Sequence, residues 1–129
     1  MEKEVFYNTD LHFEHEQWRR ELYFWEDELK SFKNRLEEIV TRWTDKDVLA
    51  QLQKYQNQFI VHGEVIDTLL HDINVHETDI SEHSKKGESD VMSHQLVRKH
   101  IDFRDRIETQ RHIYSDLKKE FFRFLSKYM

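Results

Sequence analysis

Apolar side chains recur at alternating intervals of three and four residues along almost all of this 129-residue chain, which limits the fold more than any other feature. Three series without a skipped step cover residues 11–43, 48–83 and 96–128. Such heptad spacing is typical of long helices that bury one stripe against their neighbours. The chain has no proline and only two glycines, which argues against a sheet with many turns. An all-α fold is therefore predicted.

The predicted helices have recognisable ends. They span about residues 9–43, 45–86 and 89–128. Thr44 and Asp47 have the spacing of a capping box, in which side chains satisfy the free amides of the first helical turn. Gly87 follows two lysines and favours a helix C-terminus, because glycine readily adopts the left-handed conformation that ends many helices. Ser89 and Asp90 then supply an N-cap for the last helix.

Short connections between three long helices predict a single domain over residues 1–129, folded as an up-down-up antiparallel bundle with coiled-coil-like packing. Aligning the helices across the two turns places opposite charges beside one another along the apolar stripes. The expected pairs are Glu14–Arg104, Glu21–Arg111, Glu28–Lys118, Asp79–Lys99 and Asp72–Arg106. Each exposed pair is worth only about 0.2–1 kcal/mol. Together, however, the pairs fix the register of the three helices.

The same register places three histidines, His15, His76 and His100, in one layer of the core. Three imidazoles between apolar layers cannot all be charged, because mutual repulsion and lost hydration both oppose protonation. A divalent transition metal would resolve the conflict, since each neutral ring offers a lone pair to the ion. The sequence therefore predicts a metal site, with zinc as the first choice and iron as the next.

Four further residues near this layer are candidates for the same site: His12, Glu77, Asp79 and His83. They are expected either to bind the ion directly or to accept hydrogen bonds from the outward N–H groups of the ligating rings, which would fix the ring tautomers. A second ion held by these side chains is a further alternative.

Two functions are compatible with the histidine layer. The first is a small metal-binding protein, in which an ion with an open fourth position would activate water near neutral pH. No pocket for a small-molecule substrate is predicted, so the sequence leaves open whether the protein is an enzyme. The second is a structural or partner-binding bundle whose polar layer sets the register or responds to pH. For His62, a self-contained hydrogen-bonded group with Gln110 and Tyr114 is expected instead.

Composition and charge exclude several other classes. The absence of cysteine rules out disulfides, thiol nucleophiles and thiolate metal sites. A formal net charge of -6 gives no support for a nucleic-acid partner. No apolar run is long enough to cross a membrane, and a cytoplasmic location is expected. Outward-facing apolar residues such as Phe13, Phe24 and Phe122 predict a homodimer or a partner helix.

Overall fold

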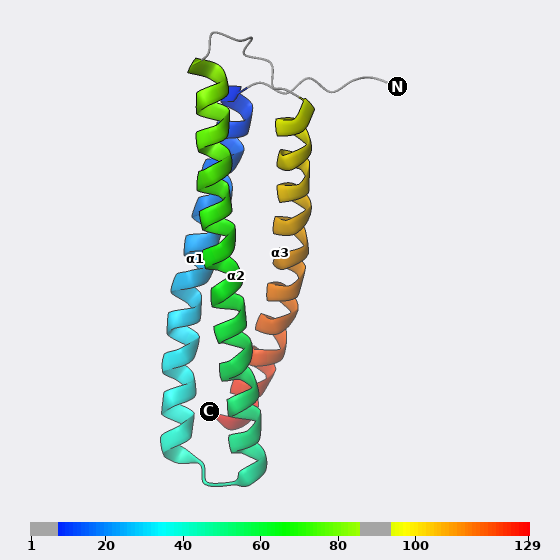
Figure 1. The fold of residues 1–129 in the computed structure, drawn as a ribbon. Helices are drawn as coiled ribbons and strands as arrows, with labels where there is room; N and C mark the ends of the chain where they lie inside the picture. Colours follow the sequence, from blue (N-terminus) through cyan, green and yellow to red (C-terminus); the bar gives the residue numbers. More distant parts are fainter. Residues whose placement is uncertain (1–7, 86–93) are drawn as a thin grey trace.

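Three long helices make up the fold (Figure 1). The computed structural model describes residues 8–85 and 94–129, with α1 at Asn8–Arg42, α2 at Lys46–Lys85 and α3 at His94–Tyr128. The helices contain 35, 40 and 35 residues and are therefore roughly 50–60 Å long. No residue within the described ranges belongs to a strand. The prediction of an all-α three-helix bundle is confirmed. The predicted caps at Gly87, Ser89 and Asp90 lie outside the described residues.

The cap at the start of α2 differs from the predicted one. Oδ1 of Asp45 accepts hydrogen bonds from the backbone amides of Asp47 and Val48, at 2.9 and 3.2 Å. Asp45 is therefore the N-cap residue, and the predicted capping box of Thr44 and Asp47 is wrong. Both side chains can cap a helix, but the carboxylate of Asp45 also places a negative charge at the positive end of the helix dipole.

Each helix buries one apolar stripe, and the three stripes meet in a shared core. Toward the turn between α1 and α2 this core is rich in aromatic rings. Phe59 and Phe121 meet edge to face with ring centroids 4.9 Å apart, and Tyr55 packs 5.0 Å from Phe124. Aromatic pairs of this kind add about 0.5–1.5 kcal/mol beyond the burial of their area. A smaller apolar cluster closes the opposite end of the core.

Ion pairs between the helices match the predicted register. They are Glu14–Arg104, Glu21–Arg111 and Glu28–Lys118 between α1 and α3, and Asp72–Arg106 and Asp79–Lys99 between α2 and α3. Their shortest N–O distances range from 2.6 to 3.9 Å. All five predicted pairs are present. Within these pairs, residue numbers rise together along α1 and α3, whereas they run in opposite order along α2 and α3.

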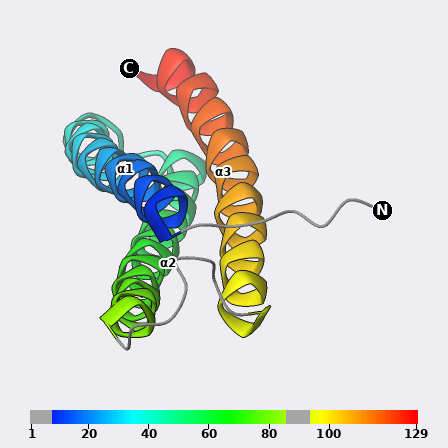
Figure 2. The ribbon, with the colours of Figure 1, turned by 90° about the horizontal axis from the view of Figure 1, so that it is seen from above.

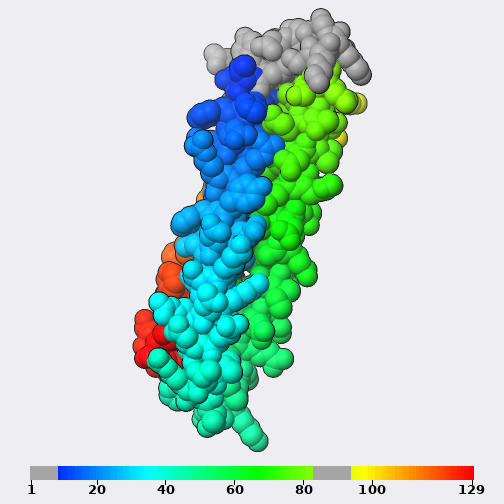
Figure 3. Space-filling model, turned by 90° about the vertical axis from the view of Figure 1, so that its left-hand side faces the viewer, coloured from blue at the N-terminus to red at the C-terminus, as the bar shows by residue number. Residues whose placement is uncertain are grey.

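The start of α1, the end of α2 and the start of α3 share one end of the bundle, and the α1–α2 turn lies at the other (Figure 1). Helices α1 and α2 lie against each other along the face shown in Figure 3. Viewed from above, the three helices surround a common centre (Figure 2). No helix among the described residues combines the length and the apolar character needed to cross a membrane.

Candidate metal centre

Three imidazole rings meet in one layer near the end of the bundle where α1 begins. His15 lies on α1, His76 on α2 and His100 on α3. The centroid of the His15 ring is 5.1 Å from each of the other two, and those two centroids are 5.5 Å apart. One ring nitrogen from each residue lies within 4.8 Å of the others. The exposed fractions are 0, 2 and 0%, so the predicted layer exists and belongs to the core.

Several nitrogens of these rings have no hydrogen-bond partner. They are Nε2 of His15, Nδ1 of His100 and both ring nitrogens of His76. A buried polar atom without a partner costs about 1–3 kcal/mol, and folded proteins contain few of them. Here such atoms come from three different helices and gather in one layer. The arrangement suits a ligand that accepts electron pairs from all three rings.

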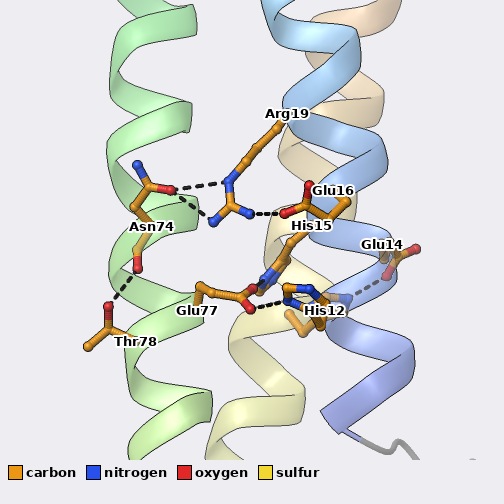
Figure 4. Close-up of polar contacts among 9 residues, drawn as sticks. His12, Glu14, His15, Glu16, Arg19, Asn74, Glu77 and Thr78 are labelled. Atoms are coloured by element: carbon orange, nitrogen blue, oxygen red, sulfur yellow. Dashed lines mark hydrogen bonds and ion pairs between the residues drawn. The ribbon is translucent and has the colours of Figure 1, made fainter.

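Two carboxylates hold the outer sides of two of the rings. Nδ1 of His15 donates a hydrogen bond to Oε2 of Glu77 (Figure 4). Nε2 of His100 donates one to Oε1 of Glu14. Because a carboxylate only accepts, these contacts place the ring proton on the outer nitrogen. In a neutral ring the other nitrogen then keeps its lone pair. Such carboxylate–histidine pairs commonly orient the histidine ligands of metal ions.

Burial keeps the three rings uncharged at neutral pH. Desolvation lowers the pKa of His15, although the hydrogen bond to Glu77 opposes this effect. Desolvation also lowers the pKa of His100 against the opposing hydrogen bond to Glu14. For His76, desolvation together with the two neighbouring imidazoles lowers the pKa to about 4. A metal ion would therefore meet no competition from protons in this layer at pH 7.

Aromatic rings support the layer on one side. Trp18 stacks on His100 with centroids 4.9 Å apart and an interplanar angle of 27°. Phe103 stacks on His76 at 5.4 Å and 26°. These flat contacts restrict rotation of the imidazoles, so the unpartnered nitrogens keep their directions without a ligand.

The structure separates the four additional predicted site residues. Glu77 contacts His15 directly, and its other oxygen, Oε1, accepts a hydrogen bond from Nδ1 of His12. Asp79 instead faces Lys99 on α3, with 3.9 Å between Nζ and the carboxylate. The side chain of His83 lies outside the described part of the chain. Among the described residues, the three core histidines are the one group spaced to hold an ion. The alternative of a second ion, which includes His83, is not tested by the described part of the chain.

Glu14 is the site residue that the sequence interpretation missed. It was assigned only to an ion pair with Arg104, which the structure contains, with Nε of the guanidinium 2.9 and 3.0 Å from the two carboxylate oxygens. Arg104 follows His100 by one helical turn, so the two side chains lie on the same face of α3. That spacing was the available signal, because a carboxylate that reaches Arg104 also reaches His100.

His62 forms the separate group predicted for it. Its Nδ1 accepts a hydrogen bond from the amide of Gln110, and its ring stacks on Tyr114 with centroids 4.4 Å apart. The Tyr114 hydroxyl in turn donates to Glu28 at 3.0 Å. Desolvation lowers the pKa of His62 to about 4. A lone neutral histidine with an amide partner cannot provide a metal site by itself.

Comparisons of the chain with protein-family models, with curated proteins and with solved structures gave no match. The histidine layer is therefore the feature from which a function can be inferred.

Proposed function

We propose that this protein binds one divalent transition-metal ion, zinc before iron, through His15, His76 and His100. The observation that carries the proposal is the convergence of three buried imidazoles, one from each helix, each with one ring nitrogen within 4.8 Å of the others. Their unpartnered nitrogens supply the electron pairs that the ion would accept.

Ligand type and geometry favour zinc. Three histidines with a fourth position for another ligand are a common zinc environment, with Zn–N distances of about 2.0–2.1 Å. Tetrahedral geometry then requires nitrogens about 3.3 Å apart. The three nitrogens lie within 4.8 Å of one another, so binding would shorten the distances between them by up to about 1.5 Å. Imidazole also suits iron, which stays the second choice.

The surrounding charges support a divalent cation. Glu14 and Glu77 place one carboxylate behind His100 and one behind His15. Their negative charge would attract the ion, although Arg104 offsets part of the charge of Glu14, and the three neutral rings contribute none. In this arrangement Glu77 and Glu14 accept hydrogen bonds from the outer N–H groups and so orient the rings. His12 steadies Glu77 from the surface, where 58% of its side chain is exposed.

When bound with an open fourth position, such an ion can act as a Lewis acid and lower the pKa of a water molecule. The part played by this chain would be to present three neutral lone pairs and to exclude bulk water from the rings. Hydrolysis or hydration would be the accessible reaction classes, with no substrate assigned.

Metal analysis of untagged protein tests the proposal. We expect one equivalent of zinc per chain after reconstitution and dialysis, and loss of that zinc in His76→Ala. His71→Ala is the matched control, because His71 lies on the same helix with an exposed side chain. Equal loss in both variants would mean that the ion binds nonspecifically at the surface.

A second candidate function is a structural or pH-sensitive polar layer without metal. It is favoured by the two carboxylate contacts, which already satisfy one nitrogen each of His15 and His100. The two functions differ in their response to a chelator at neutral pH. A melting temperature unchanged by chelator in protein purified without added metal would select the structural role.

The proposal also includes the arrangement expected from the sequence, namely one domain over residues 1–129 with up-down-up, coiled-coil-like packing. The order of the ion pairs along the helices supports it.

A homodimer is proposed as well, and apolar side chains on the surface, including Phe13, Phe24 and Phe122, support it. A cytoplasmic location is also proposed. Sedimentation analysis would measure the oligomeric state.

A further inference from the structure

The three sides of the histidine layer are closed to different degrees. Between α1 and α2, Glu77 contacts both His15 and His12 and covers the layer (Figure 4). Between α1 and α3, Glu14 contacts His100 and is held by two hydrogen bonds from Arg104. On the remaining side, between α2 and α3, no carboxylate of the described residues forms a hydrogen bond with His76.

A hollow of about 360 Å³ lies on this third side, and His76 forms part of its wall. Phe103 and Val75 supply apolar surface, and Arg106 lies over the Phe103 ring at 5.0 Å. Only 2% of His76 is exposed to solvent, yet neither of its ring nitrogens has a hydrogen-bond partner. The other hollow described beside the layer, between α1 and α3, includes none of the three ligand histidines.

The charges around this hollow are predominantly negative. Its lining contains three carboxylates, Asp72, Asp79 and Asp102, against the two cations Lys99 and Arg106. Asp72 and Asp79 pair with the two cations, at 2.9 and 3.9 Å. Asp102 has no ion-pair partner among the described residues. The unpaired carboxylate of Asp102 leaves the lining itself with one negative charge in excess, which opposes the approach of a further anion.

We propose that the fourth coordination position of the metal opens into the α2–α3 hollow and takes a small uncharged nitrogen or oxygen ligand in preference to an anion. This inference rests on the proposed metal centre and adds the side from which an external ligand reaches it. The hollow is large enough to admit an imidazole ring, which would reach the layer beside His76.

The test uses the full chain loaded with cobalt(II), whose visible absorption reports a change in its fourth ligand. Imidazole and azide are titrated separately as the probes, and retained cobalt is measured after dialysis. We expect imidazole to shift the spectrum saturably, and azide to require at least about tenfold higher concentration. An unresponsive spectrum in cobalt-loaded protein, or equal responses to both probes, would overturn the inference.

Two valines on α2 provide the location control. Val75 lines the hollow with 48% exposure, and Val61 lies two heptads earlier on the same face with 59% exposure, lining a different hollow. Val75→Phe should narrow the hollow and weaken imidazole binding by about tenfold or more, with cobalt retained. Val61→Phe should leave the titration unchanged. Equal effects in the two variants would place the ligand elsewhere.

A third variant tests the choice of ligand. Asp102→Lys reverses the charge excess of the lining, so azide should then bind at least about tenfold more tightly than to the unmodified protein. An unchanged azide response would contradict the role given to the acidic lining. Failure of the chain to bind cobalt would reject the metal centre itself, and is distinguished from these outcomes by the dialysis measurement.

Discussion

The bundle buries histidine at two heights, and the two layers use it differently. At the level of His62 one imidazole is paired with an amide and stacked on a tyrosine. At the level of His15 three imidazoles face one another, and carboxylates hold two of them from outside. Burial lowers the pKa of His62 and of His76 to about 4.

This comparison shows that burial and neutrality alone do not make a metal site. Both layers contain buried, neutral imidazoles. Only the layer of His15, His76 and His100 directs electron pairs from several helices to one place and supplies negative charge behind the rings. The His62 layer leaves one imidazole nitrogen unpartnered, and its neighbour Gln110 is a poor ligand for zinc. The contrast can be tested by perturbing one layer while the other serves as the control.

Metal removal should have the largest effect. A ligand present at about 1,000 times its dissociation constant stabilises a protein by about 4 kcal/mol, which corresponds to about 10–20 °C in melting temperature for a chain of this size. Chelator should therefore lower the melting temperature of zinc-loaded protein by that amount at pH 7. The same decrease is expected in His62→Leu, and none in His76→Leu. Below the pH at which the ligands protonate, the curves with and without chelator should converge. A large chelator effect that survives in His76→Leu would contradict the assignment of the site.

Acid should distinguish the lone histidine from an apolar residue. The pKa of His62 is about 4 in the folded protein and 6.5 in the unfolded chain, so unfolding takes up a proton between these values. The stability that His62 contributes is complete above pH 6.5 and falls as the pH decreases toward 4. In urea denaturation of metal-free protein, the free energy of unfolding should fall between pH 6.5 and pH 4 by about 3 kcal/mol less in His62→Leu than in the unmodified chain. His71→Leu, which changes an exposed ring, should follow the unmodified chain. Parallel curves for all three proteins would show that His62 protonates freely in the folded state.

Removal of a supporting carboxylate should weaken metal binding without abolishing it. Glu14→Gln and Glu77→Gln each remove the charge behind one ligand ring, and such changes typically reduce metal affinity by about 10–100-fold. Glu21→Gln is the matched control for Glu14→Gln, because Glu21 lies one heptad later on α1 and pairs with Arg111 without contacting a histidine. Competition against a chromophoric chelator measures the three affinities. If Glu21→Gln were as weak as Glu14→Gln, the effect would reflect general surface charge rather than support of the ring.

The smallest effect is expected from exchanging one ion pair that fixes the register. Glu21→Arg and Arg111→Glu should each destabilise the bundle, and the double variant should recover part of the loss. The coupling free energy in this cycle should be about 0.3–1 kcal/mol at low salt and should decrease as salt is added. Glu21 and Arg104 should show little coupling. Stronger coupling of Glu21 to Arg104 would indicate that α3 is shifted by seven residues, which would remove His100 from the layer.

Much of this structure could be predicted because the sequence repeats one physical rule without interruption. The heptad spacing predicts the helices, and alignment across the two turns predicts their register, with which the flanking charges agree. The meeting of His15, His76 and His100 follows from that register. Which of two neighbouring residues caps a helix is harder to predict. Thr44 and Asp45 are both good capping residues, and their order of preference depends on backbone geometry at the turn.

The details of the site were predicted less completely, since they depend on side-chain reach. Glu14 was placed opposite Arg104, but one carboxylate bonding both Arg104 and His100 requires the rotamers of three side chains. Likewise, the sequence assigns Asp79 both to the pair with Lys99 and to the metal site, and only the structure shows that its carboxylate lies beside Lys99. Periodicity determines which side chains share a layer and does not determine which of their atoms meet.

The position of the histidine layer along the bundle has a consequence for how the chain opens. His15 and His100 lie within the first two turns of α1 and α3, at an end where no short turn joins α1 to its neighbours. Helix ends fray first, so backbone amides in this region should exchange with deuterium early in metal-free protein. An ion bound to one histidine from each helix would crosslink the three helices and stabilise this end of the bundle. Exchange would then begin at the turn around Asp45, and the direction of unfolding along the rod would reverse.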